Sequence, residues 1–154
     1  MDFLSKNEKI LENEFTSQGF IIREAADKNA LNKIQKFIFD ILSKRGGESL
    51  DKAHEVIDIN ELNNFRLEVI NEINSQPWLR EAYYLIAKPH LDLLVGNELA
   101  MQSRVNLSIQ LPDDSSSLLP LHADTWSGDS PFEVVVWLPL VDCFKTKSMY
   151  LLPP

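Results

Sequence analysis

Residues 101–111, with the sequence MQSRVNLSIQL, decide the fold class that we expect for this chain. From Val105 to Leu111 apolar side chains recur at odd positions, and polar side chains occupy the even ones. A repeat of two is typical of a β-strand with one buried face and one polar face. The stretch therefore predicts a long strand, with Arg104, Asn106 and Gln110 on its polar face.

The residues that follow continue the β pattern in shorter pieces. A polar loop over 112–117, in which Asp113 and Asp114 are expected to be solvated, leads to a short strand that carries His122 and Asp124. A turn over 127–131 precedes an apolar run at 134–138, and a last strand begins at 149 and is stopped by Pro153 and Pro154.

The residues that precede the long strand have helical spacing instead. Apolar side chains at intervals of three and four predict one helix from Asp27, its N-cap, to Gly46, and another over about 62–73. A third helix is expected from Pro77 towards Pro89, and a weaker one over 5–17 before a short strand at 19–22. Helices followed by strands predict the α+β class, with a β part that forms a jelly roll or barrel.

Length and composition limit the kind of protein. The chain has 154 residues, 44% of them hydrophobic, and a formal net charge of -8. This predicts a single domain or a piece of one, mainly helical over 1–98 and built of strands over 99–154. The acidic balance disfavours a nucleic-acid partner, because phosphate binding needs a basic surface. Without a signal sequence or an apolar span, we expect a cytoplasmic protein with no membrane partner. The single cysteine, Cys143, excludes an internal disulfide.

His122 and Asp124 are the best candidates for chemistry. On a strand, residues two apart face the same side about 6.6 Å from each other, so an imidazole and a carboxylate there can converge on one ion. Two histidines and one carboxylate form the facial triad of non-heme Fe(II) oxygenases. The alternative is a hydrogen-bonded surface pair near a turn. The other histidines, His54 and His90, are expected to be surface or capping residues.

Three blocks in the second half of the chain carry a resemblance to a known family. They are LPLHADTW at 119–126, VWLPLVD at 136–142 and MYLLP at 149–153. In order and spacing they resemble the phytanoyl-CoA dioxygenase-like branch of the Fe(II)/2-oxoglutarate-dependent oxygenases. They are particularly similar to bacterial members found in carbohydrate gene clusters. The helices before them match only in general character.

The resemblance implies N-terminal helices packed on a double-stranded β-helix, a jelly-roll or cupin-like fold. It also implies Fe(II) held by His122, Asp124 and a distal histidine that is followed by an arginine for 2-oxoglutarate. The chain stops before either of these last two residues. We therefore expect the N-terminal part of a longer protein, with the β-helix incomplete at the C-terminus, and a 154-residue chain that is inactive by itself. A homo-oligomer is one way to cover the open edge of such a sheet.

The function implied by the resemblance is hydroxylation of a small molecule, related to carbohydrates by family analogy, with 2-oxoglutarate and O2. No catalytic residue is expected beyond the metal ligands. Arg104, Asn106 and Gln110 are candidates for the cosubstrate pocket, with a solvated strand face as the alternative, and Trp126 either closes the substrate pocket or packs in the core. The alternative function is a non-catalytic cupin-like module that binds a ligand or partner without the full metal triad. The sequence after Pro154 would discriminate the two.

Overall fold

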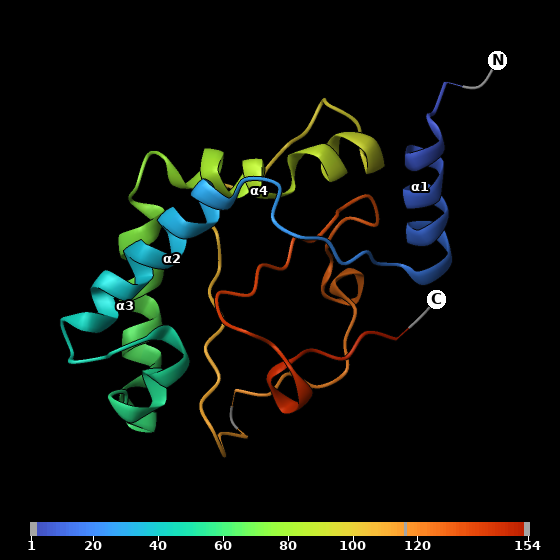
Figure 1. The fold of residues 1–154 in the computed structure, drawn as a ribbon. Coiled ribbons are helices and arrows are strands. Elements are labelled where there is room, and N and C mark those ends of the chain that lie inside the picture. Colours follow the sequence, from blue (N-terminus) through green and yellow to red (C-terminus); the bar gives the residue numbers. More distant parts are fainter. Residues whose placement is uncertain (1–2, 116, 153–154) are drawn as a thin grey trace.

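The computed structural model describes residues 3–115 and 117–152, and its regular elements are helices (Figure 1). The α-helices are α1 (Lys6–Gln18), α2 (Lys28–Ser43), α3 (Leu62–Asn74) and α4 (Leu79–Leu94). The 3-10 helices are η1 (Leu50–Glu55), η2 (Ile59–Glu61), η3 (Asp124–Ser127) and η4 (Lys145–Lys147). None of the helices in the described ranges is long and apolar enough to cross a membrane.

The predicted helices are confirmed, and local sequence explains where they begin and end. At α1, Ser5 and Glu8 form a reciprocal capping box, and the helix ends at Gly19 with a φ of 79°. At α2, the Asp27 carboxylate accepts a hydrogen bond of 2.9 Å from the backbone N–H of Ala30, as the sequence predicted. Helix α4 differs from the expectation because it continues through Pro89.

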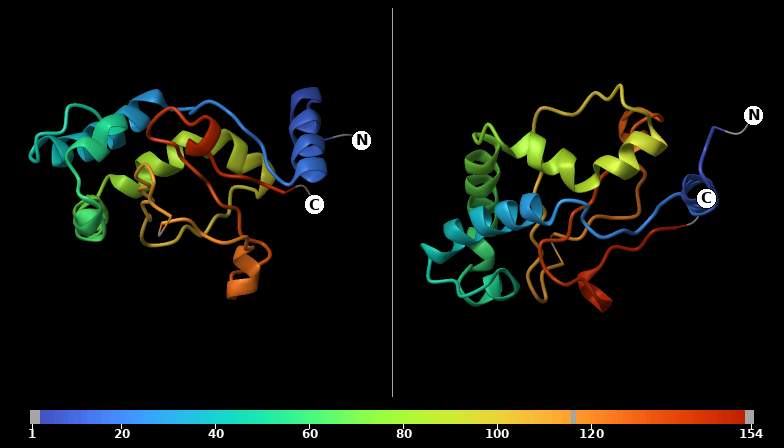
Figure 2. Two further views of the ribbon diagram at one scale, coloured as in Figure 1. Left: turned by 90° about the horizontal axis from the view of Figure 1, so that it is seen from below. Right: turned by 45° about the horizontal axis from the view of Figure 1, so that its top comes forward.

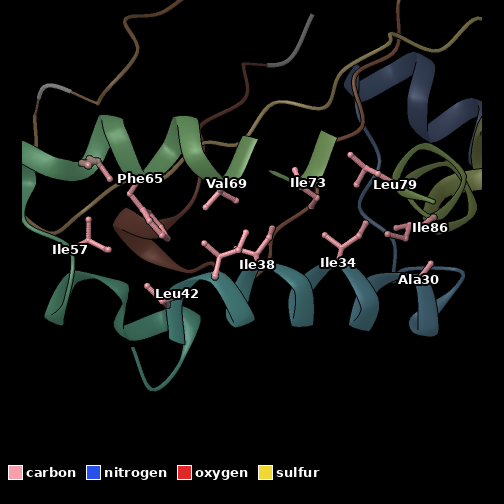
Figure 3. Packing of buried hydrophobic residues seen from close by; sticks show 13 residues of the cluster. Ala30, Ile34, Ile38, Leu42, Ile57, Phe65, Val69, Ile73, Leu79 and Ile86 are labelled. Carbon is pink, nitrogen blue, oxygen red and sulfur yellow. The ribbon is translucent and has the colours of Figure 1, made fainter. Parts of the chain in front are cut away.

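The core lies between α2, α3 and α4, and α1 lies beside this group in contact with α4. Figure 3 shows the facing rows of apolar side chains, with Ile38 and Leu42 of α2 opposite Phe65 and Val69 of α3. Leu42 and Val69 are fully buried at 0% exposure. The spacing of three and four thus places one apolar stripe of each helix in a common interior.

The predicted α+β fold with a double-stranded β-helix is wrong, because no residue of the described ranges lies in a strand. Figure 2 shows from two further sides that residues 99–152 run as loops with short 3-10 turns beside the helices. The short strands expected at 19–22, at His122 and Asp124, and from 149 onward are likewise absent from the described residues. Pro153 and Pro154, predicted to end the last strand, lie outside the described residues.

The stretch 105–111 shows why the period of two does not produce a sheet here. Its odd residues are half-buried against the helical core and its even residues are exposed, as in an extended chain. Asn74 on α3 donates from Nδ2 to the carbonyl oxygen of Val105 and accepts from the Val105 N–H at Oδ1, both at 2.8 Å. Arg66 on the same helix donates to the carbonyl oxygen of Ile109 at 2.9 Å. Side chains of α3 therefore bond this backbone where a neighbouring strand would do so.

The segment 134–140 is attached to the helices in the same way. Its even residues are half-buried and its odd residues are exposed. The Tyr83 hydroxyl of α4 donates to the carbonyl oxygen of Val136, and Nε2 of Gln35 on α2 donates to that of Leu140 at 3.0 Å. Both apolar stretches thus lie on the helical layer without pairing with each other in a ladder.

Candidate functional site

His122 and Asp124 come together at a turn and not on a strand. His122 lies in irregular chain, and Asp124 is the first residue of η3. Nε2 of His122 lies 3.8 Å from Oδ1 of Asp124, and the two side chains are 48% and 53% exposed. The two side chains therefore lie close together through a 3-10 turn that starts at Asp124, and not through the strand that the sequence predicted.

The hydrogen bond on the other side of the imidazole fixes its tautomer. Nδ1 of His122 lies 2.7 Å from the carbonyl oxygen of Pro120. A carbonyl oxygen can only accept, so the hydrogen of this bond belongs to Nδ1. In the neutral imidazole, Nε2 then presents a lone pair to the Asp124 carboxylate. Two acceptors 3.8 Å apart are the kind of pair that a metal cation can bring together.

The tautomer of His122 suits a metal ligand, and Asp124 lies close enough to be a second one. Nitrogen and oxygen ligands lie about 2.0–2.2 Å from a divalent transition-metal ion. In the facial arrangement two ligands stand at about 90°, so they lie about 3.0 Å apart when both bind one ion. The observed 3.8 Å is wider, so the two side chains have to rotate closer together to share an ion. Donation of the second ring N–H to a backbone carbonyl is also the usual arrangement of a metal-ligating histidine. Within 3–115 and 117–152, however, no group of three His, Cys, Asp or Glu side chains is placed to hold an ion.

A small hollow of about 200 Å³ adjoins Asp124. Thr125, Ser130 and Glu133 line it together with Asp124, and no basic side chain does. Its lining therefore suits hydrogen-bond donors better than the two carboxylates of 2-oxoglutarate. Trp126, in the same turn, is 74% exposed, so it does not pack in the core.

The side chains predicted to contact 2-oxoglutarate have other partners or none: Arg104 is bonded to α3, Gln110 to the loop that follows it, and Asn106 is exposed. Arg104 donates to Oδ1 of Asn71 at 2.8 Å, and Gln110 donates to the carbonyl oxygen of Ser117 at 3.5 Å. In the described part of the chain, none of the three makes a hydrogen bond or ion pair with His122 or Asp124.

One buried polar cluster escaped the sequence analysis. Asp114, expected in a solvated loop, is only 6% exposed and accepts a hydrogen bond from the Ser117 hydroxyl. Arg66 of α3 donates to the same hydroxyl at 3.3 Å. The composition of the loop gave no signal of this contact, because the arginine that anchors it lies about fifty residues away in the sequence.

The two other histidines occupy helices, and in the described residues neither belongs to a group of three side chains that could hold a metal ion. His54 is exposed in η1. His90 is half-buried in α4, where desolvation, and then the charge of Arg23, lower its pKa. Comparisons with family models, with curated proteins and with solved structures give no match to this chain.

Proposed function

We propose that His122 and Asp124 are two protein ligands of Fe(II) in a 2-oxoglutarate-dependent oxygenase that hydroxylates a small molecule. The observation that carries the proposal is the orientation of His122, whose Nδ1 is committed to the Pro120 carbonyl while Nε2 faces Asp124. The three sequence blocks that resemble this enzyme class support the choice of iron. The proposal concerns the chemistry of the pair and does not depend on a β-helix.

In this proposal the chain orients the His122 ligand and leaves the metal accessible to other molecules. The Pro120 carbonyl holds the imidazole in the tautomer that a metal needs. About half of each ligand side chain is exposed, which leaves room for a cosubstrate and a further ligand. Bound Fe(II) together with 2-oxoglutarate supplies the activation of O2 that such hydroxylations require. The hollow beside Asp124 is the candidate place for the substrate, because its hydroxyl and carboxylate lining offers hydrogen bonds.

A second candidate function is a module that binds a ligand or partner without redox chemistry. The absence of a third metal-ligating side chain beside His122 and Asp124, among the residues that the structure describes, favours it. The two candidates differ in one measurable property. A 2-oxoglutarate oxygenase binds its metal more tightly when 2-oxoglutarate chelates the same ion, whereas a module without redox chemistry has no reason to do so.

The experiment is a Mn(II) titration of the 154-residue chain followed by electron paramagnetic resonance. Mn(II) replaces Fe(II) because it does not oxidise in air during the titration. We expect weak binding by the wild-type chain, since two ligands do not define a closed site. His122→Ala and Asp124→Ala are each expected to weaken binding at least about tenfold. His54→Ala, an exposed histidine outside the site, is the control.

Adding 2-oxoglutarate should strengthen Mn(II) binding by the wild-type chain, and succinate, which lacks the chelating keto group, should not. Equal binding by the wild type and by both ligand variants would remove the pair from any metal site. Loss of binding in the variants with no effect of 2-oxoglutarate would favour the second candidate function.

A further inference from the structure

A groove of about 790 Å³ lies between α2, the residues that lead into η1, and the segment 139–142. It is a shallow groove, open to solvent along most of its length. Leu31 and Phe39 of α2 and Leu140 of the opposite wall provide half-buried apolar surface. The groove lies outside the set of residues around His122 and Asp124, so it is independent of the proposed function.

The walls of the groove are attached to the same helix. Gln35 of α2 lines the groove and donates to the carbonyl oxygen of Leu140 at 3.0 Å, which holds the far wall in place. The near wall continues from Glu48 to Asp51 at the start of η1, and Leu50 there packs against the helical core. The groove is therefore formed by elements that are each fixed to the core.

The groove carries an excess of negative charge. Glu48, Asp51 and Asp142 line it, and Lys36 is the basic side chain among its lining residues. Lys36 is already paired with Asp40 at 2.9 Å. Glu48 is paired with Lys52 at 3.2 Å.

Asp51 and Asp142 form no ion pair within the described residues, and both are exposed. Two carboxylates beside an apolar floor are thus left without a compensating cation. A positively charged ligand with an apolar body complements both features.

An extended peptide does not fit the backbone of this groove. Pro139 has no N–H to donate. The carbonyl oxygens of Leu140 and Val141 already accept hydrogen bonds from Gln35 and from the Cys143 thiol. With these groups occupied, the wall offers no regular ladder for strand addition, so recognition depends on the apolar floor and the two carboxylates.

We propose that this groove binds a small apolar amine. The hydrocarbon part lies on Leu31, Phe39 and Leu140, and the ammonium group lies near Asp51 and Asp142. Burial of the hydrocarbon supplies the affinity, and the carboxylates select the positive charge over the negative one.

The test is a titration of the ¹⁵N-labelled chain with hexylammonium, followed by amide resonances in heteronuclear NMR spectra. We expect saturable shifts at Leu31, Phe39 and Leu140. Hexanoate, which has the same chain length but the opposite charge, is expected to leave these resonances unchanged. Methylammonium, which lacks the apolar chain, is also expected to leave them unchanged. Equal shifts with hexanoate or with methylammonium would overturn the proposal.

Variants test the role of the carboxylates separately. The double variant Asp51→Asn with Asp142→Asn should bind hexylammonium about fivefold more weakly, as expected for the loss of two exposed charge contacts. Asp129→Asn, an exposed aspartate outside the groove, is the matched control and should bind like the wild type. Unchanged resonances of the α3 core would show that the double variant is folded. Wild-type affinity in a folded double variant would refute the assignment.

Discussion

Asn74→Ala tests the feature that distinguishes this fold from the predicted sheet. The Asn74 side chain bonds both the N–H and the carbonyl oxygen of Val105, each at 2.8 Å, and so acts as the strand partner of the segment 105–111. It also donates to the carbonyl oxygen of Ile70 at 2.7 Å, which fixes the amide in place on α3. Alanine removes all of these contacts without changing the apolar core.

The magnitude follows from the bonds that are lost. Two hydrogen bonds with Val105 and one to Ile70 contribute about 1 kcal/mol each, so their loss costs about 3 kcal/mol. Alanine favours a helix over asparagine by about 0.5 kcal/mol, which offsets part of the loss. The free energy of unfolding should therefore fall by about 2.5 kcal/mol. Asn63→Ala, at an exposed position of the same helix, gains the helix propensity without losing a bond to the segment.

Two measurements check this prediction, urea unfolding followed by circular dichroism and amide hydrogen exchange. In the wild type, the Val105 amide should exchange more slowly than those of residues 106–108. Asn74→Ala should remove this protection. Asn74→Asp, which retains an acceptor at Oδ1, should preserve it. Fast exchange at Val105 in the wild type, or equal stability of Asn74→Ala and Asn63→Ala, would refute the reasoning.

Two further predictions concern the end of α2 and a histidine of α4. Gly47→Ala should lower the free energy of unfolding by about 1–3 kcal/mol, because the new Cβ would lie 2.5 Å from Cγ of the buried Leu42. In a Leu42→Ala background this cost should largely disappear. An equal cost in both backgrounds would contradict the clash. The pKa of His90 is lower in the folded chain than in the unfolded chain, so on acidification the unfolded chain protonates this imidazole first. The contribution of neutral His90 to the free energy of unfolding is therefore present above pH 6.5 and is lost as the pH falls. Between about pH 7.5 and about pH 5, urea unfolding should show a larger loss for the wild type than for His90→Gln, and equal losses would exclude this role.

The helices were predictable from the sequence because their signals are local. The Asp27 cap and the apolar spacing from Ile34 to Leu42 need no knowledge of distant residues, and α2 forms as they predict. Pro89 misled the prediction of the end of α4, because a proline usually ends a helix. Here the helix continues through Pro89, and tertiary contacts such as those of the buried Ile86 hold it.

The sheet was not predictable, because a period of two reports only that one face of an extended chain is buried. From Val105 to Leu111 half-buried and exposed residues alternate in the structure as the sequence predicts, but the half-buried face packs against helices. Whether a strand or a helix faces such a segment depends on residues far away. Asn74 and Arg66 supply the hydrogen bonds here, and neither is marked in the sequence as a partner of the segment.

For His122 and Asp124 the predicted strand is absent, but the two side chains still lie close together. The His-x-Asp spacing was interpreted through strand geometry, yet His122 and Asp124 approach to 3.8 Å in a 3-10 turn. The short spacing confines the two side chains to one neighbourhood in either conformation, because two residues of chain cannot separate them far. What the turn adds is the Pro120 carbonyl, which lies within reach of Nδ1 and turns Nε2 towards the carboxylate. The chemistry of this pair thus depends on the tautomer that Pro120 selects, and a metal titration of the His122 and Asp124 variants tests it directly.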